Sequence, residues 1–118
     1  MKYALLIYGS DADWVDLPDE EKAGLRAEEM PRWLALFDEL RKADPEVTGQ
    51  ELDSRLKAKV VRVRDGERIV TDGPFAETKE LIGGLVVIEL PDLDEAIRIA
   101  ALVPAADHGS IEIRPLEE

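Results

Sequence analysis

The sequence predicts an α+β fold: a ferredoxin-like, split β-α-β sheet with two helices on one face and an extra β-hairpin. Three observations carry this prediction. They are the order of apolar runs and helical segments, an Asp-Gly pair between two β-rich runs, and a helix-start signal before the last strand. A chain of 118 residues, 45% of them hydrophobic, fits one compact domain spanning 1–118.

The first strand is predicted from a continuous apolar run, and the first helix from an acidic start and an apolar stripe. Lys2 to Tyr8 is nearly all apolar, which is typical of a strand buried on both faces and central in its sheet. A helix should run from the acidic start near Leu17 to about Lys42, kinked or divided by Pro31, which removes a backbone donor. Its second half would bury one apolar stripe: Trp33, Leu34, Phe37 and Leu40.

A hairpin is predicted in the middle of the chain, after a short strand at Val47 to Leu52. Ala58 to Arg64 and Glu67 to Val70 are strand-like and are separated by Asp65-Gly66. An Asp-Gly pair suits a type I′ turn, which needs positive φ at both central positions.

The last third of the chain should supply a strand, a helix and a final strand. Leu85 to Leu90 follows Gly83-Gly84, where we expect a bulge or a close backbone approach. Asp92 with Glu95 three residues later matches a capping box. The buried stripe of the helix would comprise Leu93, Ala96, Ile97 and Ala100. Ser110 to Arg114 alternates as a half-buried strand does.

Composition limits the functions that are open to the chain. A net charge of −12 argues against a nucleic-acid or anionic-membrane partner, because such partners require a cationic face. With no cysteine and one histidine, we expect no disulfide, no metal site and no cofactor. The first apolar run is too short for a signal peptide, so we expect a cytoplasmic protein. The apolar strands exceed what two helices can cover, which favours a homodimer.

An ordered set of motifs resembles a known family. KYALLIYG, VRVRDG, TDGPFAETKE, a Gly-Gly pair, PDLDEA and GSIEIRP follow one another along nearly the whole chain. In this order they resemble the YCII-related proteins of the DGPF type, small bacterial proteins with a dimeric α+β barrel fold. The resemblance implies that fold, a homodimer and a cleft, and it leaves the reaction open.

The resemblance also bears on catalysis. Some relatives carry a His two residues after a Pro on the first helix, near an Asp, as an acid-base pair. Here Trp33 stands two residues after Pro31, and an indole cannot exchange protons at neutral pH. Many DGPF-type proteins are encoded beside, or fused to, extracytoplasmic-function sigma factors.

Three functions therefore stay open. The first is binding of a small molecule in a cleft beside the DGPF loop. The second is an interaction or regulatory module for an extracytoplasmic-function sigma factor. The third is a cofactor-independent enzyme, like the monooxygenases that share this barrel.

The candidate site lies around the DGPF loop. Asp72 is the candidate catalytic residue, because it ends a strand just before the rigid Gly73-Pro74 turn. Its alternative role is a turn Asp that accepts backbone N–H groups. The candidate ligand-binding residues are Tyr8, Trp33, Asp72, Glu77 and Lys79. For Trp33 the alternative is a core or dimer contact, and for Glu77 and Lys79 it is a solvated charge run.

His108 is the only imidazole of the chain and follows Asp107 in a turn before the last strand. We expect a surface residue, unless a dimer brings it to a cleft as an acid-base group.

Overall fold

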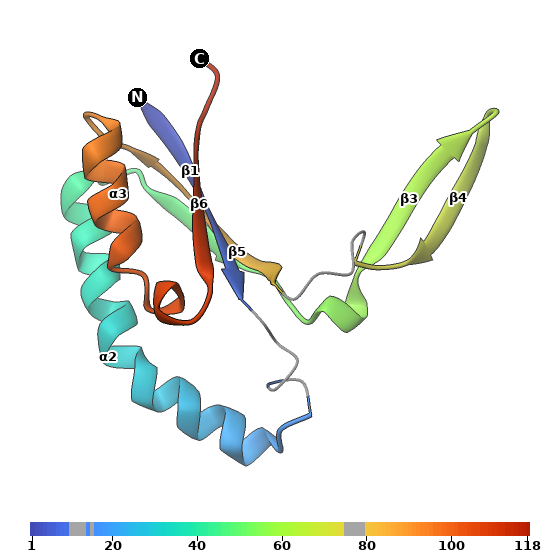
Figure 1. Ribbon diagram of the computed structural model, residues 1–118, viewed down its shortest axis with the longest axis horizontal. Coiled ribbons are helices and arrows are strands. Elements are labelled where there is room, and N and C mark those ends of the chain that lie inside the picture. The colour runs from blue at the N-terminus through green and yellow to red at the C-terminus, as the bar shows by residue number, and fades with distance from the viewer. Residues whose placement is uncertain (10–13, 15, 75–79) are drawn as a thin grey trace.

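A computed structural model describes residues 1–9, 14, 16–74 and 80–118, and it confirms an α+β fold with antiparallel sheets (Figure 1). The main sheet has the strand order β2-β5-β1-β6, and every neighbouring pair is antiparallel. Its strands are β1 (Lys2–Gly9), β2 (Thr48–Glu51), β5 (Leu81–Glu89) and β6 (Ser110–Pro115). Because β5 lies between β1 and β2, the sheet has the predicted split β-α-β arrangement.

Two helices cover one face of this sheet. Helix α2 (Asp19–Ala43) joins β1 to β2, and α3 (Leu93–Ala101) joins β5 to β6. Pro31 lies inside α2, which is continuous but runs in two directions in Figure 1, so the expected kink takes the form of a bent single helix. Asp92 caps α3 by accepting a hydrogen bond from the Glu95 backbone N–H at 2.9 Å.

The core lies between the helices and the alternate residues of the sheet that point toward them. Its largest fully buried side chains include Tyr3, Leu5, Ile88 and Ile99. Successive residues of β1 alternate between the two faces, so Tyr3 and Leu5 face the helices while Ala4 and Leu6 face the other way.

The predicted apolar stripes of both helices were partly wrong. In α2 the buried residues are Leu36 and Leu40, whereas Leu34 is 54% exposed. In α3 the buried residues are Ala96, Ile99 and Ala100, while Leu93 and Ile97 are half exposed. Both observed stripes keep the 3.6-residue period, but the helices are rotated so that a neighbouring row of side chains meets the sheet.

The two glycines in β5 take both predicted roles. The pairing of β1 with β5 shifts between Ile7 and Tyr8, which face Gly84 and Ile82, so Gly83 is the extra residue of a bulge. A Cβ on Gly84 would lie 3.1 Å from the Gln50 carbonyl oxygen of the neighbouring strand.

The predicted hairpin forms a separate two-stranded sheet. It consists of β3 (Lys59–Arg64) and β4 (Glu67–Asp72), and Asp65 and Gly66 at its turn have φ values of 53° and 77°. A short 3-10 helix, η1 (Arg55–Lys57), precedes it, and a second, η2 (Pro104–Asp107), leads into β6. Figure 1 shows the hairpin on one side of the main sheet and both helices on the other.

Within the described residues, no element covers the second face of the main sheet. Ala4, Leu6, Leu85 and Val87 meet there by register, and all four are half-buried rather than buried. The open sheet face, as we call this surface, is therefore apolar at its centre. The radius of gyration is 16.4 Å, against about 13 to 14 Å expected for a compact chain of this length.

In the described residues, no helix is both long enough and apolar enough to cross a lipid bilayer.

Candidate functional site

A tyrosine and a glutamate from neighbouring strands form a hydrogen bond on the open sheet face. The Tyr8 hydroxyl donates to Glu112 Oε1 at 3.1 Å. Both residues belong to this face because they alternate with Ile7, Ile111 and Ile113, which pack against the core. The Glu112 carboxylate raises the pKa of Tyr8, and the positive charge of Arg114 acts weakly in the other direction.

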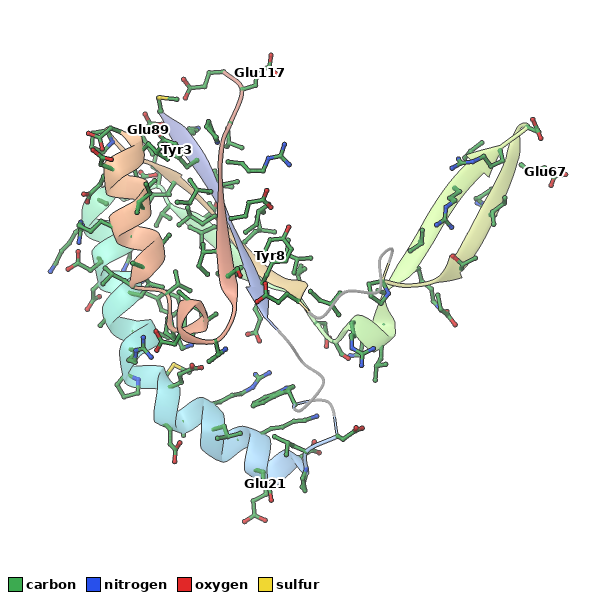
Figure 2. The ribbon with its side chains drawn as sticks, viewed as in Figure 1. Tyr3, Tyr8, Glu21, Glu67, Glu89 and Glu117 are labelled. Carbon is green, nitrogen blue, oxygen red and sulfur yellow. The ribbon has the colours of Figure 1, made fainter. Side chains whose placement is uncertain are left out.

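A second polar contact at this end of the sheet involves Glu80, the last residue of the DGPF segment (residues 71–80). The Ser110 hydroxyl donates to Glu80 Oε2 at 2.8 Å, and Ser110 is the register partner of Tyr8 across β1 and β6. Gly9 pairs with Leu81, which follows Glu80 directly. The chain therefore enters β5 beside Tyr8, directly after Glu80. Together Tyr8, Glu80, Ser110 and Glu112 form what we call the sheet-end cluster, and Figure 2 shows Tyr8 near this end of β1.

Asp72 lies at the base of the hairpin. Its carboxylate forms a hydrogen-bonded ion pair with Lys59 Nζ, its register partner on β3, and this contact lowers the pKa of Asp72. The Asp72 side chain is 86% exposed. Among the described residues, Asp72 shares no hydrogen bond or ion pair with Tyr8 or Trp33.

The glycine after Asp72 has a structural role. The Gly73 backbone N–H donates to the Ala58 carbonyl at 2.9 Å, and a Cβ on Gly73 would lie 2.9 Å from the Ala58 Cβ. A side chain at this position would push the two ends of the hairpin apart. Glu77 and Lys79 lie outside the described residues, so their assignment to the site stays a prediction.

Trp33 lies on the other side of the sheet, on α2. Its ring packs against the core and lies 6.0 Å from the Phe37 ring, centroid to centroid. The indole N–H donates to Glu29 Oε2 at 3.3 Å, one helical turn away. Tyr8 faces the open side of the sheet, so the single chain does not bring Tyr8 and Trp33 together.

The only histidine lies beside the carboxylate that holds Trp33. His108 Nε2 is 3.7 Å from Glu29 Oε1, and its side chain is 67% exposed. The adjacent Asp107 accepts a hydrogen bond from Arg32 Nη1 at 2.6 Å, which lowers the pKa of Asp107. This contact fixes η2 against α2. Water competes with the contact between His108 and Glu29, because both side chains are accessible to solvent.

A shallow groove of about 270 Å³ lies between α3 and β6. Its lining includes Ile97, Ala100, Ile111 and Ile113, and it contains neither Asp72 nor Trp33. In the part of the chain that the structure describes, no group of three or more His, Asp or Glu side chains could hold a metal ion.

The sequence model of the YCII-related domain matches residues 1–118. The chain belongs to the YCII family. It is also 48% identical over 61 residues to an uncharacterized protein of Rhizobium meliloti (strain 1021), a match that covers 50% of this chain and 49% of the relative. The match thus spans about half the length of either protein.

Sequence reasoning missed most of the sheet-end cluster of this YCII protein. Glu112 alternates with two isoleucines, so its outward direction could have been predicted from the sequence. Its meeting with Tyr8 could not, because the two residues are 104 positions apart and depend on strand register. Glu29 was missed although it lies four residues before Trp33, a spacing that brings helical side chains together.

Proposed function

We propose that this YCII protein is a homodimer that binds a small polar molecule at the DGPF end of the open sheet face. The observation that carries the proposal is the hydrogen bond between Tyr8 and Glu112 on a sheet face that none of the described elements covers. A phenol, a hydroxyl and two carboxylates lie at the same end of the sheet, in two hydrogen-bonded pairs. Such a set of polar groups beside apolar surface is typical of small-molecule sites.

The dimer supplies the cover that such a site needs. The centre of the open sheet face is formed by Ala4, Leu6, Leu85 and Val87, and half-buried apolar side chains in one patch mark an interaction surface. A second copy that packs its own open face on this one buries both patches by the same contacts. The sheet-end cluster then lies at the rim of the interface, where a cleft between two sheets can enclose a ligand.

A thermal-shift screen against a library of polar metabolites tests the binding proposal. For any compound that raises the melting temperature of the wild-type protein, Tyr8→Phe and Glu112→Gln should each reduce the shift by more than half. Glu117→Gln, a remote carboxylate in the C-terminal tail, is the matched control and should keep the full shift. Undiminished shifts in both cluster variants would exclude the sheet-end cluster as the site.

Asp72→Asn tests whether the hairpin base belongs to the same binding site as the sheet-end cluster. If the hairpin base belongs to the same site, this variant loses the ligand-induced shift while the protein stays folded and dimeric. If only the sheet-end cluster binds, Asp72→Asn behaves like the control. A chain that sediments as a monomer at micromolar concentration would contradict the homodimer.

A further inference from the structure

The β3–β4 hairpin exposes an apolar face, against which nothing packs in the part of the chain that the structure describes. Val61 and Val70 are register partners, and Val63 lies two residues further on the same face. These three side chains, which we call the valine face, are 60%, 54% and 61% exposed. A two-stranded hairpin is at best marginally stable alone in water, so a face of three exposed valines needs a surface to cover it.

The hairpin leaves the body of the protein from a firm base. The Gly73 N–H bond to the Ala58 carbonyl and the Lys59–Asp72 ion pair close its two strands where they meet the rest of the chain. These contacts fix the start of the hairpin, while every residue of β4 is exposed. The hairpin is thus an ordered arm rather than a folded-back loop.

Charge indicates what covers the arm. Residues 58–72 contain four basic and three acidic side chains, a net charge of +1. Since the whole chain carries −12, the remaining residues carry −13. The hairpin, at +1, and the remainder of the chain, at −13, carry net charges of opposite sign, which favours a second copy as the partner, while the net charge of −12 disfavours a nucleic acid or another acidic partner.

The position of the arm agrees with this partner. Figure 1 shows the hairpin on the side of the main sheet opposite α2 and α3, the side on which the open sheet face lies. We propose that the hairpin is an arm that packs its valine face against the acidic body of the second copy, a role that rests on the proposed homodimer.

Sedimentation equilibrium of matched variants tests the arm. The double variant Val61→Glu/Val63→Glu should weaken the dimer at least about 100-fold, because two side chains of the valine face then carry charge against an acidic surface. Ile69→Glu/Thr71→Glu places the same two charges on the opposite face of the hairpin and should alter the dissociation constant by no more than about threefold. Val87→Glu, on the open sheet face, should also separate the copies.

These variants distinguish failure of the arm from failure of the dimer. If Val87→Glu separates the copies while Val61→Glu/Val63→Glu dimerises like the wild type, the sheet-face dimer stands and the arm proposal is overturned. A monomeric wild-type protein overturns both proposals.

Hydrogen exchange gives a readout that needs no mutation. Amides of the hairpin should lose protection when the wild-type protein is diluted below its dimer dissociation constant. Equal protection above and below that concentration would overturn docking of the arm, even if the protein dimerises through its open sheet face.

Discussion

Tyr8 and Glu112 lie diagonally across the β1–β6 pair, and the Tyr8 hydroxyl donates to Glu112 Oε1 at 3.1 Å. Diagonal neighbours on one face of a sheet are within reach of long side chains. This contact places a phenol and a carboxylate on the open sheet face, over which no described element packs. Removing this contact should also change the pKa of Tyr8, which can be measured by titration.

Glu112→Gln should lower the pKa of Tyr8. The carboxylate raises this pKa because it accepts a hydrogen bond from the phenol O–H and repels a phenolate, so the neutral phenol persists to higher pH in the wild type. An ultraviolet absorbance titration measures the change, and Tyr8→Phe identifies the transition that belongs to Tyr8. An unchanged midpoint in Glu112→Gln would show that the contact does not form in solution.

Gly109→Ala should destabilise the fold by about 1 to 3 kcal/mol. A Cβ on Gly109 would overlap the carbonyl oxygen of Tyr8, and it would lie 3.1 Å from the carbonyl oxygen of Ala105. The turn before β6 would have to move away from the end of β1. Urea unfolding at one fixed protein concentration measures the loss.

Gly24→Ala is the matched control for that substitution. Gly24 lies in α2, and a Cβ there meets no atom within 4 Å. Alanine in a helix interior is favoured over glycine, so this variant should gain about 0.5 to 1 kcal/mol. Equal effects at the two glycines would contradict the close approach of the turn to Tyr8.

Asp44→Asn should remove part of the acid sensitivity of the fold. The Asp44 carboxylate accepts hydrogen bonds of 2.9 Å from the backbone N–H groups of Glu89 and Glu46, which lower the pKa of Asp44 below its ordinary value of 3.8. A folded-state pKa below the unfolded one contributes stability above pH 3.8, and that stability is lost as pH falls through the folded pKa.

The gap between wild type and Asp44→Asn should therefore be largest near neutral pH and should close in acid. Urea unfolding at several pH values measures it, with Glu117→Gln as a control that should track the wild type. A gap independent of pH would mean that the carboxylate charge of Asp44 has no part in holding β5 to the end of α2.

Asp92→Ala should cost about 1 kcal/mol of stability, because the first turn of α3 loses its side-chain acceptor for the Glu95 N–H. Asp92→Ser supplies another good capping oxygen and should recover most of that loss. Thermal or urea unfolding compares the two. If serine were as damaging as alanine, the capping role would be wrong.

Local patterns predicted the elements of the fold well, because each depends on neighbours in the chain. The Asp65-Gly66 turn, the Asp92 cap and the Gly83 bulge were all confirmed. The rotation of the helices was predicted less well. Periodicity identifies an amphipathic helix, but which of two adjacent rows is buried depends on the sheet beneath it, as Leu34 and Leu36 show.

For the candidate site, too, single residues could be predicted from local sequence, whereas their partners could not. Tyr8 was found from its place at a strand end near a glycine, whereas its partners come from β6 and from the far end of the DGPF segment. Trp33 and His108 were both singled out, but only the fold places Glu29 beside both of them.

Residue order alone was enough to specify the family, the split β-α-β order and the hairpin, since turns, caps and apolar periods act over a few residues. The tertiary structure decided which side chains meet. It set Tyr8 against Glu112 on the open sheet face, left Asp72 exposed at the hairpin base, and placed the valine face away from the core. These outcomes depend on strand register and on the relative placement of whole elements, which no short segment of the chain encodes.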